Sequence, residues 1–367
     1  MPKILFDHQK FTTQRYGGIS RYFANIVQQI AQSTDFSSEV GLLYSQNHYL
    51  SPSGNELDRF MSPLLRHHRL SDLLYKANQA YSHRLVKKDD FDLFHPTYYD
   101  TYFLEDLKKP MVTTIHDMTY EKLPEYFWAQ DPLTHNKRLH IERADAIIAI
   151  SETTKSDLMR YHRVDEDKIR VIYHGIDLKQ PLEFAPVEGL PDSYLLYVGD
   201  RSGYKNFYLF IDAFKAISQK YPKLEVILTG GGRLGIADQE LLHRLGLTQK
   251  VKHVQVTDEQ LNTLYSRAEI FVYPSLHEGF GLPILEAFKA NCPVLLSDTP
   301  CFREIAQSAV AYFQPHSLDD FIEQIDQLLA QPDRRTQLVQ RGNKRLQDFP
   351  IEKSIKETLA LYVSLMK

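Results

Sequence analysis

The sequence predicts an α/β protein made of two domains, each built on a parallel sheet. The chain has 367 residues, which is long for one domain. Short apolar runs bounded by Gly, Asp or Pro alternate with helix-length segments, a pattern typical of parallel strands buried on both faces. Residues 177–193, with three prolines and no clear periodicity, interrupt this alternation and indicate a linker. We therefore expect a first domain over 1–190 and a second over 191–350.

The predicted strands fall into two groups. Before the proline-rich segment the apolar runs are KILFD, VTTIHD, AIIAIS and IRVIYHG, and after it they are YLLYVGD, LEVILTGG, IFVYPS and PVLLSD. The first strand of each group leads, through a loop with Arg and Gly, into a helix that bears aromatic residues. Two domains of this design are expected to bind a ligand beyond the carboxyl ends of their strands, in a cleft between them.

Composition and charge narrow the class of protein. A net charge of −4 gives no general reason to expect a nucleic-acid partner. Cys292 and Cys301 are too few for a disulfide framework or a four-ligand zinc site, so we expect buried free thiols, a reducing compartment and no metal. The start, MPKILFDHQ, is typical of a first strand rather than a leader, and no apolar run approaches the roughly 20 residues of a membrane-spanning helix. We expect a cytoplasmic protein that meets a membrane only from its surface.

One basic segment suits such a contact. Residues 59–88 have a helical pattern and hold seven Lys or Arg against one Asp. The apolar residues that recur at helical spacing with basic neighbours are Leu64, Leu65, Leu70, Leu73, Leu74 and Tyr81. This pattern predicts peripheral contact with an anionic membrane, and it also fits a solvated helical face.

A glycine-rich run in the second half is open to two interpretations. GGGRLG, residues 230–235, formally matches the dinucleotide fingerprint after a strand, and Asp258 lies further along the chain. Taken alone it suggests a nicotinamide enzyme. A glycine loop at a strand end admits a nucleobase or ribose equally well.

Two other loops are candidates for phosphate binding. Gly17 and Gly18 stand immediately before a predicted helix, where the backbone can approach an anion and unpaired N–H groups face it, although a plain strand-to-helix turn has the same pattern. Arg201 and Lys205 share one loop after the fifth predicted strand. Two cations at the end of a buried strand can close on a diphosphate, and the alternative is a pair of solvated side chains.

His116 and Asp117 follow a predicted strand in the first half. A histidine in this position can donate to a sugar hydroxyl or act as an acid or base, and the carboxylate can orient it or shape the loop. The alternative is a loop histidine satisfied by the backbone.

HEGFGLPILEAF, residues 277–288, holds two glutamates on either side of a glycine-proline turn. Glu278 lies in the loop, Pro283 is placed as the first helical residue, and Glu286 would fall in the first turn, where the helix dipole stabilises an acid whatever its function. The loop amides of residues 280–282 could bind phosphate or sugar oxygens.

This stretch and several other motifs resemble those of a known family. PSLHEGFGLPILEAFKANCPVLLSD resembles the donor-binding signature of the retaining glycosyltransferases of family 4. RYGGISRY, TIHDMTYEKLPEYF, ISETTKSDL, VIYHGID, YVGDRSGYKN and EIFVYPS look like further landmarks of that family in its order, so the resemblance covers essentially the whole chain. It implies the GT-B fold, two facing Rossmann-like domains with the active site in the interdomain cleft, and a last helix, 351–367, that packs back onto the first domain.

The resemblance also implies residue roles. Glu286 would bind ribose hydroxyls and Glu278 the transferred sugar, Arg201 and Lys205 would hold the diphosphate, and His116 would contact the donor sugar near the reacting carbon. The expected catalytic residues are thus His116, Arg201, Lys205 and Glu278, and the expected donor-binding residues are Gly17, Gly18, Phe280, Gly281, Leu282 and Glu286.

The implied reaction transfers a hexose, with mannose as one candidate, from a nucleotide-diphosphate sugar to a glycan or lipid-linked acceptor in surface polysaccharide biosynthesis. The co-substrate would be GDP-mannose or a UDP-sugar, and no other cofactor is expected. Both nucleotides stay open because no residue pattern separates uracil from guanine. No carboxylate stands out as a nucleophile for double displacement, which favours the front-side, metal-independent reaction proposed for the family. A sugar-nucleotide epimerase of the same fold and a non-catalytic nucleotide-sugar-binding protein remain as alternatives.

Overall fold

The computed structural model describes residues 1–50 and 68–366 and confirms the α/β class. It divides into two compact units: unit 1 comprises Met1–Lys122, Trp128–His174 and Glu352–Lys367, and unit 2 comprises Leu123–Phe127 and Gly175–Ile351. Residues 175–190, which the sequence assigned to the first domain, thus lie in unit 2. They are fastened there because Lys289 Nζ donates to the carbonyls of Asp177 (2.6 Å) and Gln180 (2.7 Å).

Unit 1 is a parallel α/β unit. Its strands are β1 (Lys3–Phe6), β2 (Ser37–Val40), β3 (Leu93–His95), β4 (Val112–Ile115), β5 (Ala146–Ala149) and β6 (Ile169–Val171). Its helices are α1 (Gln9–Thr13), α2 (Gly18–Ala31), α4 (His68–Lys88), α5 (Thr119–Lys122), α6 (Leu133–Arg143), α7 (Glu152–Tyr161), the 3₁₀ turn η2 (Glu166–Lys168) and α15 (Ile351–Leu365). The strands pair in the orders β2-β1-β3 and β4-β5-β6, and a parallel bridge from Phe94 to Met111 joins the two sets.

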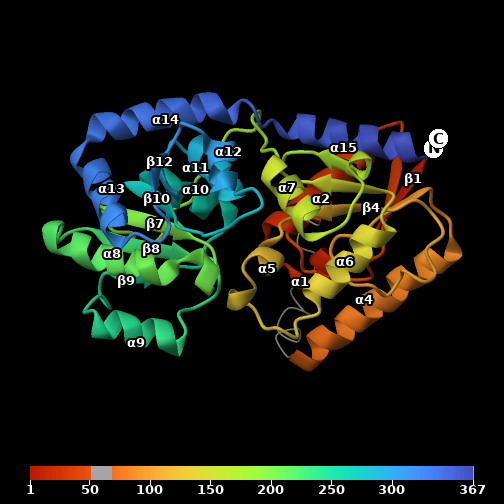
Figure 1. Cartoon of the computed structure of the whole chain (residues 1–367), viewed down its shortest axis with the longest axis horizontal. Coiled ribbons are helices and arrows are strands. Elements are labelled where there is room, and N and C mark those ends of the chain that lie inside the picture. Colours follow the sequence, from red (N-terminus) through yellow and green to blue (C-terminus); the bar gives the residue numbers. More distant parts are fainter. Residues whose placement is uncertain (51–67, 367) are drawn as a thin grey trace. The chain divides into compact units, whose positions relative to one another are not determined.

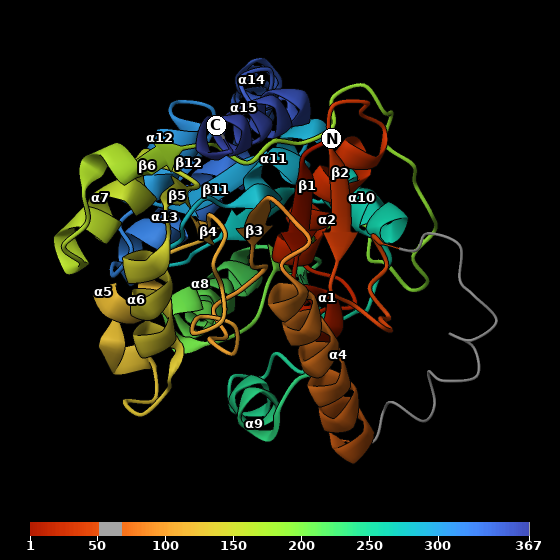
Figure 2. The ribbon, with the colours of Figure 1, turned by 90° about the vertical axis from the view of Figure 1, so that its right-hand side faces the viewer.

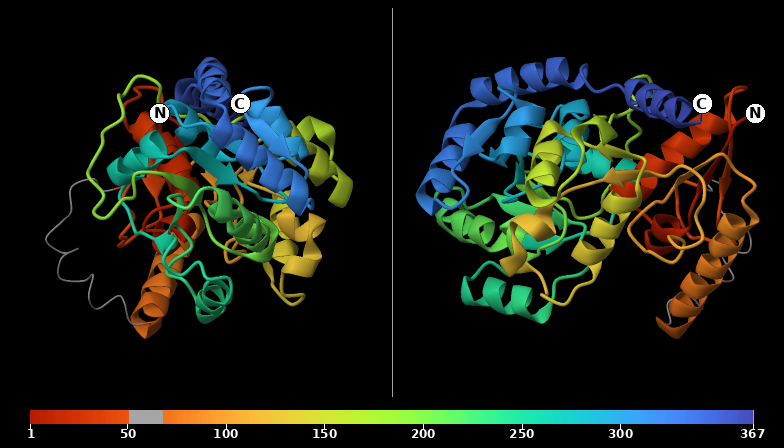
Figure 3. Two further views of the ribbon diagram at one scale, coloured as in Figure 1. Left: turned by 90° about the vertical axis from the view of Figure 1, so that its left-hand side faces the viewer. Right: turned by 45° about the vertical axis from the view of Figure 1, so that its right-hand side comes forward.

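The last helix, α15, packs in unit 1. Tyr362 is fully buried in one core cluster with residues of β1 and α2, and Figure 3 shows α15 lying beside α2. The Tyr362 hydroxyl lies 2.6 Å from Nδ1 of His95, at the end of β3, and Nε2 of the same ring lies 2.9 Å from the Thr114 hydroxyl. The carboxyl end of the chain is thereby bound to the sheet.

Unit 2 repeats the design with six strands. They are β7 (Tyr194–Val198), β8 (Glu225–Thr229), β9 (Val251–His253), β10 (Ile270–Tyr273), β11 (Val294–Ser297) and β12 (Ala311–Phe313), all parallel, in the order β12-β11-β10-β7-β8-β9. The helices are α8 (Phe207–Lys220), α9 (Ile236–Arg244), α10 (Asp258–Arg267), α11 (Leu282–Lys289), α12 (Pro300–Ala306), α13 (Leu318–Ala330) and α14 (Pro332–Leu346), with 3₁₀ turns η1 (Pro124–Tyr126) and η3 (Gly203–Lys205). Figure 1 shows α8 and α13 on one face of this sheet and α10 and α11 on the other.

The residue composition of the strands explains why some of them were not predicted. The eight apolar runs of the sequence contain β1, β4, β5, β6, β7, β8, β10 and β11. Four strands were missed. β2 (SSEV) and β9 (VKH) are mostly polar, and β3 (LFH) and β12 (AYF) have only three residues each, so none of them stands out as an apolar run. Cys292 and Cys301 are buried free thiols, as their number predicted.

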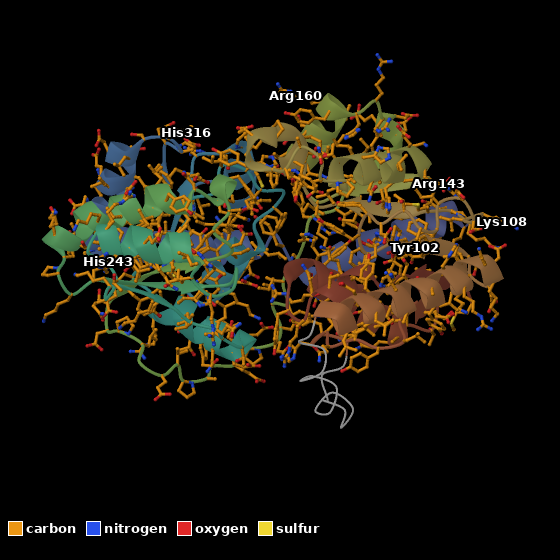
Figure 4. The ribbon with its side chains drawn as sticks, turned by 90° about the horizontal axis from the view of Figure 1, so that it is seen from below. Tyr102, Lys108, Arg143, Arg160, His243 and His316 are labelled. Atoms are coloured by element: carbon orange, nitrogen blue, oxygen red, sulfur yellow. The ribbon has the colours of Figure 1, made fainter. Side chains whose placement is uncertain are left out.

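Part of the basic segment forms α4, and residues 59–67, with Leu64 and Leu65, lie outside the described residues. Figure 2 shows α4 extending beyond the strands of unit 1. Its inner face makes hydrogen bonds to the rest of unit 1. For example, the hydroxyl of Tyr102, which is labelled in Figure 4, donates to Ser82 Oγ at 2.6 Å. Near its amino end Leu70 and Leu73 are exposed, at 38% and 63%. Among the described residues, no helix is both long and apolar enough to cross a bilayer.

Candidate functional site

The order of the unit 2 strands identifies where a ligand would bind. Strand order reverses between β7 and β10, which are neighbours in the sheet but far apart in sequence. In open parallel sheets, loops at the carboxyl ends of two such strands diverge and leave room for a ligand. Here the first loop ends in η3, which carries Lys205, and the second is the loop 274–281, which carries Glu278.

Lys205 and Glu278 meet at this point. Lys205 Nζ lies 2.6 Å from Glu278 Oε1, and the two side chains are only 12% and 14% exposed. Burial by itself lowers the pKa of Lys205, but the charge of Glu278 and the nearby hydroxyls of Tyr273 and Tyr204 outweigh it, so the pKa lies well above its ordinary value. The site therefore holds a protonated amine and a carboxylate in a largely buried ion pair. A charged or polar group of a ligand can replace either partner.

The glycine-proline turn depends on a glycine in the left-handed region. Gly281 adopts φ +97°, in the left-handed region, and precedes α11 as its N-cap. A Cβ there would lie 2.9 Å from Ile284 Cδ1, so both the backbone angle and the space require glycine. The Phe280 side chain is 2% exposed and packs edge-on against Phe349, so this residue can offer a ligand only its backbone.

Glu286 lies elsewhere than the sequence predicted. Helix α11 begins at Leu282, one residue before Pro283, and has no acid in its first turn. The prediction of a first-turn glutamate is therefore wrong, and the helix dipole does not account for this residue. Instead the buried Tyr265 of α10 donates its hydroxyl to Glu286 Oε2 at 3.2 Å, which orients the carboxylate.

Arg201 is bound to the protein backbone. Its Nη1 and Nη2 donate to the four carbonyls of residues 230–233 at 2.8–3.4 Å, and its Nε donates to Asp238 Oδ2 at 3.0 Å. Gly230, Gly231 and Gly232 all have positive φ, so this loop turns tightly around the guanidinium. In the structure Arg201 therefore shapes the glycine-rich loop, and the motif that formally matched a dinucleotide fingerprint surrounds an arginine with its carbonyl groups.

In unit 1 the two glycines lie at the amino end of α2. Gly17 is the N-cap and Gly18 the first helical residue. Gly17 has φ 167°, ordinary extended backbone, but a Cβ there would lie 2.6 Å from Gln14 Oε1. That amide oxygen accepts from Ser20 N at 3.1 Å, so the Gln14 side chain occupies one of the helix N–H groups that were expected to face a phosphate.

His116 follows β4 and is 8% exposed. Burial, and then the neighbouring His174, lowers its pKa well below the ordinary value, so the imidazole is neutral. The ring of His174 stacks with it at 6.0 Å and 23°, and Tyr22 is edge-on to both. Asp117 Oδ1 accepts from Thr119 N at 2.9 Å, so this carboxylate shapes the start of α5.

Three residues that hold the site were not predicted from the sequence. Tyr273 donates to Glu278, Tyr265 to Glu286, and Asp238 accepts from Arg201. Asp238 had a local signal, since it stands three residues after Gly235 and accepts from its amide at 3.0 Å, as in a capping box. The tyrosines had none, because they read as ordinary core residues of a strand and a helix. In the described ranges, 1–50 and 68–366, no three His, Cys, Asp or Glu side chains gather as a metal site would require.

The fold of the chain is similar to that of solved glycosyltransferase structures. The chain superimposes on Anabaena HepE, solved in complex with UDP and glucose, with a TM-score of 0.74 at 19% identity over 100% of both chains. The fold is therefore GT-B, the two-domain α/β architecture of a large group of glycosyltransferases.

Models of two protein families match the two halves of the chain. The model "Glycosyltransferase Family 4" matches residues 16–180, and "Glycosyl transferases group 1" matches residues 181–345. The chain belongs to glycosyltransferase family 4.

Two relatives of the chain are O-antigen chain mannosyltransferases. The O-antigen chain mannosyltransferase RfbU of Salmonella typhimurium is 30% identical over 60% of this chain, and the match spans 62% of that protein. The O-antigen chain mannosyltransferase B of Escherichia coli is 27% identical over 94% of this chain and 95% of its own length.

Proposed function

We propose that this chain is a retaining glycosyltransferase that transfers a hexose from a nucleotide-diphosphate sugar to a glycan or lipid-linked acceptor. The observation that carries the proposal is the Lys205–Glu278 pair, 2.6 Å apart at the reversal of strand order in unit 2. A cation and a carboxylate side by side match a donor whose diphosphate is anionic and whose sugar carries hydroxyls. When the donor binds, Lys205 exchanges Glu278 for the diphosphate, and Glu278 turns to the sugar hydroxyls.

The other residues divide the donor among them. Glu286, oriented by Tyr265, takes the ribose hydroxyls, and the backbone of residues 280–282 takes sugar or phosphate oxygens. Arg201 acts through the loop that it shapes, and its charge adds to the positive potential there. From unit 1, Gly17 and Gly18 contribute the helix amino end to the phosphate, and neutral His116 contributes a hydrogen bond to the sugar.

The reaction that these groups serve is a front-side displacement. The bond from the anomeric carbon to the diphosphate oxygen breaks as the acceptor oxygen forms its bond on the same face, and the acceptor proton passes to the departing phosphate oxygen. The negative charge that develops on the diphosphate is stabilised by Lys205 and by the helix amino end, without a requirement for a metal ion. The configuration at the anomeric carbon is retained.

The sugar and setting are proposed from the relatives. Mannose, carried by GDP, is the first choice because both curated relatives above are named as O-antigen mannosyltransferases. A UDP-sugar is the second, since HepE was solved with UDP and glucose. The product would be a surface polysaccharide made at the cytoplasmic face of the membrane, with exposed Leu70 and Leu73 of α4 as the contact.

The test begins with thermal shifts in the presence of UDP-, GDP- and ADP-sugars, because a ligand that binds the folded state raises its apparent stability. The stabilising donor is then used in transfer assays with Lys205→Met, Glu278→Gln and the control Lys220→Met, which removes an exposed pair with Asp326 on the same unit. We expect K205M to weaken nucleoside-diphosphate binding about tenfold or more. E278Q should still bind the diphosphate, since Lys205 loses its competitor, and yet fail to transfer sugar.

Four results would contradict the proposal. The absence of any stabilising nucleotide-sugar would remove the donor, and an epimerised donor formed without acceptor would indicate an epimerase. Binding without turnover on any lipid-linked glycan would indicate a non-catalytic protein. An inverted anomeric configuration in the product, read by NMR, would exclude retention.

A further inference from the structure

A short aromatic segment lies in unit 2 although the chain on either side of it belongs to unit 1. The segment is Leu123–Phe127, and the flanking stretches, up to Lys122 and from Trp128, are counted with unit 1. It forms the single turn η1, in which the amides of Tyr126 and Phe127 donate to the carbonyls of Leu123 and Pro124, both at 3.1 Å. The backbone of the turn thus satisfies itself, and the two aromatic side chains are left to make contacts.

These side chains pack on η3, the turn that carries Lys205. A Cβ added at Gly203 would lie 2.5 Å from Tyr126 Cδ1, so the tyrosine ring fills the space of the missing side chain. Gly203 is not among the glycines with positive φ, and its backbone would accept any residue. The ring of Tyr126 is therefore the reason for glycine at this position. Next to it the rings of Phe127 and Tyr204 lie 5.4 Å apart, inclined by 40°.

The same turn is held from its other side by the loop of Glu278. Leu276 N donates to the carbonyl of Tyr204 at 2.8 Å. Lys205 Nζ lies 5.0 Å from the centroid of the Tyr204 ring and 2.6 Å from Glu278. Tyr204 thus lies between the aromatic segment and the Lys205 ammonium, and its position affects both.

We propose that Tyr126 and Phe127 form an aromatic clasp that positions Lys205 for the donor diphosphate; this inference rests on the function proposed above. Turn η3 has three residues and is followed by Asn206 in the left-handed conformation, so it has little stability of its own. The clasp restricts it from one side and the loop 274–281 from the other. A cation that is held in place before the donor arrives binds a diphosphate without the entropy loss of ordering a flexible loop. Tyr126 and Phe127 are positioning residues and touch no reacting atom.

The functional test separates donor binding from general damage. Tyr126→Ala removes the ring, Tyr126→Phe keeps it, and Tyr208→Ala is the matched control, since Tyr208 of α8 is 45% exposed against 39% for Tyr126. We expect Y126A to raise the KM for the donor about two- to tenfold, the range that an aromatic pair is worth, and to leave the KM for the acceptor unchanged. Y126F and Y208A should match the wild type. A donor KM of Y126A equal to that of the wild type would overturn the proposal, as would equal losses in Y126A and Y126F.

The contact itself can be tested without a donor. Gly203→Ala places a methyl group against the Tyr126 ring. We expect this substitution to lower the melting temperature when Tyr126 is present and to leave it unchanged in the Y126A background. Equal losses in both backgrounds would mean that the ring does not lie over Gly203, and the proposal would fail. If no nucleotide-sugar is a substrate of the wild type, the proposed function fails on its own, and this double-mutant cycle still reports on the clasp.

Discussion

At the scale of single residues, the site shows how a charged side chain is occupied before any ligand is bound. Lys205 holds Glu278, and Arg201 holds four backbone carbonyls and Asp238. The two cations were expected to act alike on a diphosphate, but their surroundings differ. Lys205 has a partner that a ligand can replace, whereas release of Arg201 would break its hydrogen bonds to four backbone carbonyls and to Asp238 at once. We therefore propose that the lysine contacts the diphosphate directly and that the arginine shapes the loop.

This difference predicts the behaviour of Arg201→Lys. Lysine keeps the charge but lacks the planar fork that reaches several acceptors at once. We expect the free energy of unfolding to fall by about 2 kcal/mol, because several hydrogen bonds are lost, and the affinity for nucleoside diphosphate to fall with it. Chemical denaturation and calorimetric titration measure the two effects.

The control is Arg233→Lys, an exposed arginine of the same loop. If R201K binds the diphosphate as tightly as the wild type and is equally stable, then Arg201 serves by charge alone and the shaping role is refuted.

At the scale of elements, α4 has two faces with different surroundings. Its inner face bonds to the rest of unit 1, for instance through Asn78, which is fully buried and donates to Thr12 Oγ1 and to the carbonyl of Tyr44, both at 2.9 Å. Its outer face exposes Leu73 together with Lys76 and Arg84. A rigid helix with leucine and basic side chains on its free face is suited to the surface of an anionic bilayer.

We expect the protein to sediment with vesicles that contain phosphatidylglycerol and not with vesicles of phosphatidylcholine alone. Leu73→Glu should abolish this binding, and Lys76→Ala with Arg84→Ala should weaken it by about 1 kcal/mol for each charge removed. Leu43→Glu is the control, because Leu43 is 59% exposed outside α4. Equal sedimentation of wild type and L73E would contradict the assignment of this face.

At the scale of the whole molecule, buried imidazoles gather in unit 1. Burial lowers the pKa of His8 and His140 to about 4 and that of His95 and His174 to about 3. An unfolded histidine titrates near 6.5. Between about pH 6.5 and 4 these histidines are therefore protonated in the unfolded chain and neutral in the folded protein. Stability is therefore present above pH 6.5 and is lost as the pH falls. Asp7, whose pKa burial raises to about 6, opposes this trend because its folded carboxyl takes up a proton first.

We expect the free energy of unfolding to decline on acidification from pH 6.5 to 4.5, and His140→Gln to reduce the slope by about 1.4 kcal/mol per pH unit. His140 is suited to the test because its Nε2 bonds to the carbonyl of Asp100 at 2.9 Å, which a glutamine amide can also do. Denaturation at a series of pH values gives the slope. His243→Gln on exposed α9 is the matched substitution (Figure 4), and an unchanged slope in H140Q would show that this ring is not buried in its neutral form.

Much of the fold could be read directly from the residues. The long apolar runs predicted the central strands, because a strand buried on both faces needs such a run, and the glycines predicted where the backbone turns, as Gly281 does. The loops that bear Lys205, Glu278 and His116 were found because they follow those strands. The short strands β2, β3, β9 and β12 were not predicted. The start of α11 and the passage between units at His174 were not predicted either, since they depend on contacts that no local pattern records.

By itself the sequence determined the order of the eight strands with clear apolar runs, the family and the loops that hold the candidate residues, since periodicity and turn chemistry act over a few positions. The tertiary structure decided which of these residues meet. Lys205 and Glu278 are 73 residues apart in the chain, and His95 and Tyr362 are 267 apart, yet each pair is in contact. Sheet topology brings together loops that the chain separates, and the space around each side chain then determines whether a cation binds a carboxylate, a row of carbonyls or an aromatic ring.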